Sequence, residues 1–132
     1  MNADKKGGLT VNSPYVELAV EVFSMLADAT RVRIILALRD EELSVNHLAD
    51  IVDKSPAAAS QHLAKLRLAR IVTTRQEGQR VFYRLTNEHA RQLVADAIFQ
   101  AEHSVDAVPA HHRGDHPAPA PASISVEGAR RA

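Results

Sequence analysis

Residues 44–68 read SVNHLADIVDKSPAAASQHLAKLRL, and this stretch decides the fold. Ser44 can cap a short helix, a break follows at Asp53-Lys54, and Ser55-Pro56 opens a second helix that we expect to end near Leu68. Two short helices joined by a tight turn are typical of a helix-turn-helix, whose second helix reads DNA. An unrelated helical hairpin remains the alternative at this point. The predicted inner faces carry Leu48, Ile51 and Val52 in the first helix and Ala59, Leu63 and Leu66 in the second.

The segment after these two helices has the pattern of a β-hairpin. Residues 71–76 and 80–85 are rich in Val, Thr, Phe and Tyr, and Glu77-Gly78-Gln79 between them contains the glycine of a tight turn. A basic hairpin directly after a helix-turn-helix is a wing, which reaches the phosphates or the minor groove beside the recognition helix. Arg75 and Arg80 flank the tip of this wing. The order of elements therefore favours DNA binding over an unrelated helical hairpin.

Further helices are expected on both sides of this core. Ser13-Pro14 predicts the start of a helix over residues 14–27, and Asp28 can cap the next one. A terminal helix from about Asn87 to Val105 carries apolar residues every three or four positions, and a twin helix from a second subunit is the simplest partner for that stripe. We therefore predict a mainly α fold with a small β-hairpin: a homodimeric winged helix-turn-helix in the order α-α-α-α-β-β-α.

Composition divides the chain into four segments. Residues 1–13 are polar, which predicts a flexible arm, and residues 14–106 form the predicted DNA-binding and dimerisation domain. Residues 107–116 contain three histidines and are interpreted as a metal-binding extension. Residues 117–132 begin with alternating proline and alanine, which predicts a disordered tail.

The formal net charge is zero, but the charges are segregated along the sequence. Residues 54–84 contain seven basic residues and one acidic residue, whereas residues 17–53 contain eight acidic residues and three arginines. Segregation of this kind gives a neutral protein a basic face, and phosphate binding depends on the face rather than on the total charge.

Several classes of function are disfavoured by what the sequence lacks. There is no cysteine, which excludes disulfides, thiolate metal sites and cysteine nucleophiles. No run of apolar residues is long enough to span a bilayer, so we expect no membrane partner and a cytoplasmic location. The sequence shows no nucleophile–base constellation and no phosphate-binding glycine loop, so we expect no enzymatic activity.

Three motifs resemble one family and occur in its order. They are LADATR at residues 26–31, SQHLAKL at residues 60–66, and Gly78 followed by VFYRL at residues 81–85. Over roughly residues 15–105 the chain is similar to the ArsR/SmtB metal-sensing repressors. The resemblance implies a homodimer that binds a palindromic operator and represses genes for metal export or detoxification. It also implies that metal binding lowers the affinity for DNA, and we expect the dimer to form through the first and last helices.

The recognition helix has several positions that the core does not require. Gln61 is the best candidate for a base contact, because its amide can pair with adenine in the major groove. Ser60 and Lys65 are expected to hold phosphates, as are Arg75 and Arg80 of the wing. His62 is expected to be a packed structural histidine, with a ligand or a base reader as the alternatives. The complete expected set is Pro56, Ala57, Ala58, Ser60, Gln61, Lys65, Arg75 and Arg80.

Most histidines lie in the C-terminal third, which predicts a metal site. His89 and His103 are separated by fourteen residues, or about 21 Å along one helix, so a single ion cannot join them within one chain. In an antiparallel pair of terminal helices, His89 of one subunit can lie opposite Glu102 and His103 of the other. The expected ligands are His89, Glu102, His103, His111 and His112, with His116 as a weaker candidate.

The ligand set also indicates the metal. Imidazoles with one carboxylate and no sulfur suit nickel, cobalt or zinc. The zinc sensors of the family use an aspartate and a further histidine at positions that hold Asn87 and Gln100 here, and the histidine pattern resembles that of the nickel- and cobalt-sensing members. We therefore predict a repressor released by nickel or cobalt. The alternatives are a zinc-responsive repressor, a family member without metal sensing and, less favoured, a histidine-rich metal-storage protein.

Overall fold

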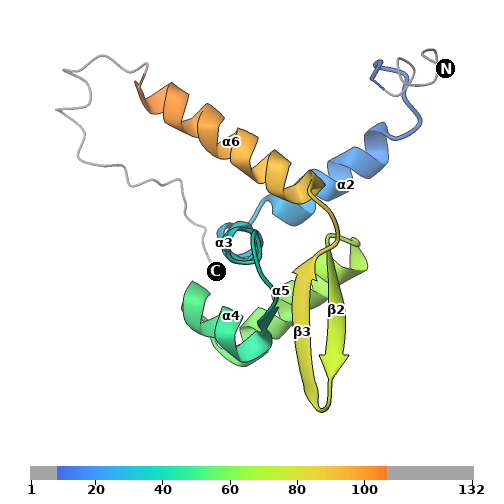
Figure 1. Ribbon diagram of the computed structural model, residues 1–132. Coiled ribbons are helices and arrows are strands. Elements are labelled where there is room, and N and C mark those ends of the chain that lie inside the picture. Colours follow the sequence, from blue (N-terminus) through green and yellow to red (C-terminus); the bar gives the residue numbers. More distant parts are fainter. Residues whose placement is uncertain (1–8, 107–132) are drawn as a thin grey trace. The chain divides into compact units, whose positions relative to one another are not determined.

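A computed structural model describes residues 9–106 of the chain. Residues up to Ala95 belong to one unit, and the last helix continues from Asp96 into a second unit. Residues 1–8 of the arm predicted over residues 1–13, the histidine extension over residues 107–116 and the tail over residues 117–132 lie outside the described residues. The elements are α2 (Val16–Leu26), α3 (Ala29–Ala37), β1 (Leu43–Ser44), α4 (Val45–Val52), α5 (Pro56–Leu68), β2 (Val72–Glu77), β3 (Arg80–Leu85) and α6 (His89–Asp106), as Figure 1 shows.

The helix-turn-helix consists of α4 and α5. The Ser44 hydroxyl accepts a hydrogen bond from the backbone N–H of His47 at 3.3 Å, and the Ser55 hydroxyl accepts one from Ala58 at 3.1 Å. Between the two helices Asp53 adopts a left-handed conformation with φ of 59° and ends α4. Both predicted caps are confirmed, because each serine satisfies a backbone N–H that has no partner within its own helix.

The first two described helices meet at a corner formed by Asp28. Its carboxylate accepts a hydrogen bond from the backbone N–H of Arg31 at 2.9 Å, which confirms the predicted cap of α3. The predicted start of the preceding helix is wrong by two residues. The Ser13 hydroxyl accepts from the N–H of Tyr15, and the helix begins only at Val16. Ser13 therefore closes a turn before the helix instead of capping its first turn.

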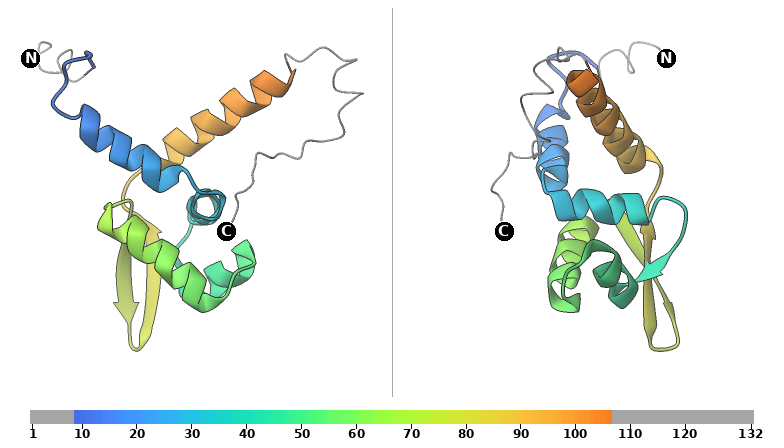
Figure 2. Two further views of the ribbon diagram at one scale, coloured as in Figure 1. Left: turned by 180° about the vertical axis from the view of Figure 1, so that it is seen from behind. Right: turned by 90° about the vertical axis from the view of Figure 1, so that its left-hand side faces the viewer.

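The wing is the hairpin of β2 and β3, which belongs to a three-stranded antiparallel sheet in the order β1-β3-β2. β2 and β3 pair from Val72 opposite Leu85 to Glu77 opposite Arg80, and the two-residue turn between them places Gly78 at φ of 63°. Tight two-residue hairpin turns of the primed types require a positive φ at this position. Figures 1 and 2 show that the tip of the hairpin projects beyond α4 and α5. The two-residue strand β1, which pairs with β3, was not predicted.

The core lies between α3, the helix-turn-helix and the sheet. The start of α6 adds to it, because Ala90 and Val94 are both buried. Part of the apolar stripe of α6 is therefore covered by its own chain. The prediction that a partner subunit covers the stripe is wrong for these two residues. The largest fully buried side chains are Ile34, Ile35, Leu48, Leu63, Leu66 and Val72. The predicted fold class, a winged helix-turn-helix, is confirmed.

Candidate nucleic-acid interface

Helix α5 has one face in the core and an opposite face in solvent. Ala59, Leu63 and Leu66 are buried, and they recur at the spacing of one helical face. The opposite stripe consists of small and polar side chains that the core does not use. Of the predicted recognition residues, Pro56, Ala57, Ser60, Gln61 and Lys65 are exposed and Ala58 is half-buried.

The surroundings of this face are more basic than the predicted set of DNA contacts suggests. Lys54 lies in the turn before α5, Arg67 lies in its last turn, and Arg70 follows it. All three side chains belong to exposed residues. They were counted in the basic segment but not selected as DNA contacts. All three lie within two residues of an end of the recognition helix. This position is the sequence signal by which they could have been predicted as phosphate contacts.

Arg75 of the wing already has partners in the free protein. Its Nε donates to Oε1 of Glu42 at 2.8 Å, and its NH1 group donates to Oε1 of Glu77 at 3.4 Å. The hydrogen bond to Glu42 is the main reason why the pKa of Arg75 is raised above its ordinary value. A DNA phosphate at this position would have to compete with two carboxylates for one guanidinium.

Phe82 joins the two predicted wing arginines. The guanidinium carbon of Arg75 lies 4.9 Å from the centre of the Phe82 ring, and that of Arg80 lies 5.3 Å from it. Cation–π contacts of this length hold both cations over one ring. Phe82 was not a predicted functional residue. The two-residue turn Gly78-Gln79 fixes the register that places Phe82 opposite Arg75, and this turn length could not be read from the sequence.

His62 is a packed residue of α5, as predicted. Its side chain is 24% exposed, and its Nδ1 atom lies 3.1 Å from the NH1 group of Arg31. Burial is the largest of the effects that lower the pKa of His62, and the opposing attraction of Asp28 does not outweigh them. Arg31 and Asp28 come from α3 and its cap, so this contact joins residues about thirty positions apart in the sequence.

The predicted metal ligands are not brought together within the described part of one chain. His89 begins α6 and His103 lies in its last turn, so the two imidazoles are held apart by the length of the helix. Residues 9–106 contain no group of three or more His, Cys, Asp or Glu side chains that could hold an ion. Glu102 and His103 are exposed, while His111, His112 and His116 lie outside the described residues.

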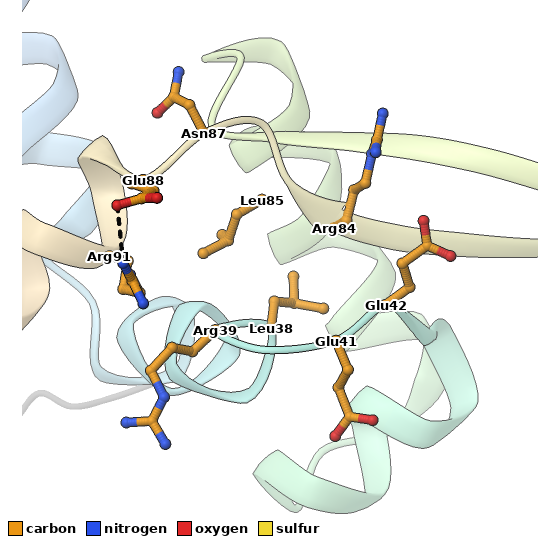
Figure 3. A pocket seen from close by; sticks show the side chains of 9 residues that line it. All are labelled: Leu38, Arg39, Glu41, Glu42, Arg84, Leu85, Asn87, Glu88 and Arg91. Carbon is orange, nitrogen blue, oxygen red and sulfur yellow. Dashed lines mark hydrogen bonds and ion pairs between the residues drawn. The ribbon is translucent and has the colours of Figure 1, made fainter.

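A hollow of about 380 Å³ lies beside the start of α6 but does not have the chemistry of a metal site. Glu88 and Arg91 form an ion pair at 3.0 Å along one edge of it, and Leu38 and Leu85 lie between the charged side chains (Figure 3). Its three carboxylates face an equal number of guanidinium groups, and it contains no histidine. The remaining lining residues are Arg39, Glu41, Glu42, Arg84 and Asn87.

Comparison with known proteins shows which family the chain belongs to. Residues 28–74 match the family described as bacterial regulatory protein, arsR family. Over 96 residues the chain is 60% identical to the HTH-type transcriptional regulator KmtR of Mycobacterium tuberculosis, a match that covers 73% of this chain and 74% of that protein. The chain belongs to the ArsR family. As a member of that family it is a DNA-binding transcriptional regulator, and the expectation that it is not an enzyme is confirmed by these relatives.

Other members of the ArsR family extend the comparison. The chain is 45% identical over 79 residues to the cadmium resistance transcriptional regulatory protein CadC homolog of Staphylococcus aureus, covering 59% of this chain and 65% of that protein. It also superposes with a TM-score of 0.59 and 26% identity on the homodimeric winged helix-turn-helix domain Mb0332 of Mycobacterium bovis, covering 70% of this chain and 89% of that one. Among the helices described here, none is both long and apolar enough to cross a membrane.

Proposed function

We propose that this ArsR-family regulator binds double-stranded operator DNA as a homodimer, represses the genes it controls, and leaves the DNA when it binds nickel or cobalt. The observation that carries the DNA-binding half is the solvent-facing stripe of α5, in which Ser60, Gln61 and Lys65 lie on one face opposite the buried leucines. The effector half depends on the histidines of α6 and of the segment that follows it.

The stripe of α5 supplies different kinds of DNA contact. Gln61 is assigned to a base edge, because an amide can pair with adenine through two hydrogen bonds in the major groove. Ser60 and Lys65 are assigned to phosphates, which fix the register without reading sequence. The small residues Pro56, Ala57 and Ala58 allow the start of the helix to approach the duplex. Arg80 of the wing is a further phosphate contact, and Arg75 becomes one when it is released from Glu42.

Exposed apolar side chains on α2 support a dimer. Val20 and Phe23 are 59% and 58% exposed, and no residue of α2 is buried. A helix with this much apolar surface needs a partner, and the homodimeric relative Mb0332 shows that the architecture can pair with itself. We assign the dimer interface to α2 and α6.

The proposed metal site spans this dimer. His89 of one subunit would join Glu102 and His103 of the other, with His111 and His112 as further ligands and His116 as a weaker one. A set of imidazoles and a carboxylate without thiolate suits nickel, cobalt and zinc, and a count of five or six ligands favours nickel and cobalt over tetrahedral zinc. The chain has no cysteine, so we do not extend the cadmium response in the name of the CadC homolog to it.

An ion that links the two α6 helices would control DNA binding through the geometry of the dimer. Two recognition helices must match half-sites one helical turn apart, and a changed angle between subunits destroys that match. Allosteric coupling energies of about 1 to 3 kcal/mol correspond to a fall in operator affinity of roughly 5- to 150-fold.

The test begins with a duplex that the protein itself selects from a random-sequence library. Fluorescence anisotropy then measures the affinity for this duplex in EDTA and with nickel, cobalt or zinc chloride in excess. We expect tight binding in EDTA and a fall of at least about fivefold with nickel or cobalt. A fall with zinc alone would favour the zinc-responsive alternative. Affinities that are equal under all four conditions would leave a DNA-binding regulator without metal sensing.

A further inference from the structure

The side chain of Arg31 connects three elements of the fold. Its Nε donates to the carbonyl oxygen of Met25 in the last turn of α2 at 2.7 Å, and its NH1 group lies 3.1 Å from Nδ1 of His62 in the middle of α5. Its backbone N–H donates to the carboxylate of Asp28, the cap of α3. One residue of α3 therefore ties the end of α2 to the helix that is assigned to DNA reading.

This connection depends on the protonation state of His62. A guanidinium can only donate hydrogen bonds, so Nδ1 of His62 must accept, and it has a lone pair only when the imidazole is neutral with its proton on Nε2. A protonated imidazole would direct an N–H group at the guanidinium. Oδ2 of Asp28, which could accept this proton, lies 3.8 Å from Nδ1 and already caps α3. Protonation therefore breaks one contact and competes for another.

We propose that the hydrogen bond from Arg31 to His62 is a positioning contact for DNA binding, which holds the solvent-facing stripe of α5 in its reading orientation relative to α2 and is lost when His62 is protonated. The proposal rests on the DNA-reading role of α5 proposed above. His62 and Arg31 act through the orientation of Gln61 and Lys65, not by touching DNA themselves.

The charged groups that act on His62 favour the neutral state. Arg31, Lys65 and Lys54 all lower its pKa together with burial, and Asp28 raises it less than these lower it. Arginine and lysine keep their charge between pH 5 and pH 8. Within that range, protonation of the His62 imidazole is therefore opposed by fixed positive charge on α3, on α5 and in the turn before α5.

The sign of the pH dependence distinguishes this proposal from simple electrostatics. An additional positive charge on a DNA-reading helix normally strengthens the attraction to phosphates, so protonation of histidines should raise the affinity for DNA. The positioning contact predicts the opposite effect for His62. All other histidines contribute equally to the wild type and to a variant that differs only at residue 62, so the difference between the two isolates His62.

The experiment measures affinity for the selected duplex in EDTA between pH 8 and pH 5.5. In His62→Asn the side-chain oxygen can accept from Arg31 and has no proton to gain, whereas His62→Leu retains bulk but accepts nothing. At pH 8 we expect His62→Asn to bind like the wild type and His62→Leu to bind about fivefold more weakly. As the pH falls towards 5.5, the wild type should lose affinity relative to His62→Asn, up to the roughly fivefold loss expected for His62→Leu.

Each other result would count against the positioning contact. Parallel pH profiles for the wild type and His62→Asn would overturn it, as would full affinity of His62→Leu or weak binding by His62→Asn at pH 8. Circular dichroism at both ends of the range checks that every variant is folded. A wild type that selects no duplex at pH 8 would overturn the proposed function and this inference with it, whereas tight binding with parallel profiles would overturn this inference alone.

Discussion

Nε of Arg75 donates a hydrogen bond to Oε1 of Glu42 at 2.8 Å, and this pair ties the wing to the residue before β1. The guanidinium also lies over the Phe82 ring and reaches Glu77. The free protein therefore holds Arg75 in place on the wing, with its charge partly compensated by two carboxylates. A DNA phosphate would therefore compete with Glu42 and Glu77 for the same guanidinium.

The first prediction concerns Glu42→Gln. Removing the carboxylate releases Arg75 for phosphate, so we expect the affinity for the selected duplex at low salt to rise about two- to fivefold. Stability should change by less than about 1 kcal/mol, because exposed ion pairs contribute little. Asp40→Asn is the matched control, since it removes an equal charge from a residue that pairs with Arg39. An equal gain from Glu42→Gln in an Arg75→Ala background would contradict the competition between Glu42 and phosphate.

Gln61 and Lys65 should differ in how they affect specificity. Gln61→Ala should weaken binding to the selected duplex by about 1 to 3 kcal/mol while leaving binding to unrelated DNA unchanged. Lys65→Ala should weaken binding to both duplexes and lower the salt slope of log affinity by about one. Anisotropy titrations at several salt concentrations measure both quantities. Loss of affinity for unrelated DNA in Gln61→Ala would show that Gln61 contacts the backbone instead of a base.

Arg70 tests whether a left-handed backbone conformation costs stability at the end of α5. It follows the recognition helix at φ of 64°, in the left-handed region that favours glycine. Arg70→Gly should therefore stabilise the protein by about 0.5 to 1 kcal/mol in urea unfolding. Arg67→Gly, within the last turn of α5, is the control and should destabilise it by up to about 1 kcal/mol, because its backbone is helical. A loss of stability in Arg70→Gly would mean that the arginine side chain contributes more than the backbone strain removes.

His103 should be required for the metal response but not for DNA binding. His103→Ala is expected to bind the selected duplex in EDTA within about twofold of the wild type and to lose the fall in affinity caused by nickel. His47→Ala is the control, because His47 is an exposed histidine of α4 outside the proposed ligand set. A nickel response that survives in His103→Ala would remove this residue from the site.

The same account gives a pH dependence for the metal response. Histidine ligands bind metals only when they are neutral, so the nickel effect should weaken below about pH 6, near the ordinary pKa of histidine. The measurement is the ratio of affinities with and without nickel at each pH. The ratio removes the contribution of pH to DNA binding itself, including that of His62. A ratio that stays constant down to pH 5 would contradict a site built from imidazoles.

Most of the fold could be predicted from residues that act on their neighbours in the sequence. Ser44, Ser55 and Asp28 each satisfy backbone N–H groups within three residues, so the sequence nearby contains the whole interaction. The turn at Gly78 is equally local. The strand β1 was missed because it has only two residues and exists through its pairing with β3, about forty residues later.

The candidate site was less predictable for the same reason. The contact from Arg31 to His62 and the pair between Arg75 and Glu42 join residues 31 and 33 positions apart, and neither follows from spacing along one element. The burial of Ala90 and Val94 was likewise unpredictable, because an apolar stripe does not indicate which surface covers it. The exposed stripe of α5 could be predicted because its buried face has a clear helical period.

The central claim is that one ion is shared by two subunits, and mixed dimers test it most directly. In a symmetric dimer, His89→Ala and His103→Ala each damage both proposed sites, but a dimer with one variant of each kind retains one undamaged site. We predict that neither variant alone binds nickel tightly in calorimetry. An equimolar mixture, re-equilibrated to about half mixed dimers, should recover about one quarter of the wild-type stoichiometry. A mixture that binds no more nickel than the separate variants would contradict a site shared between subunits.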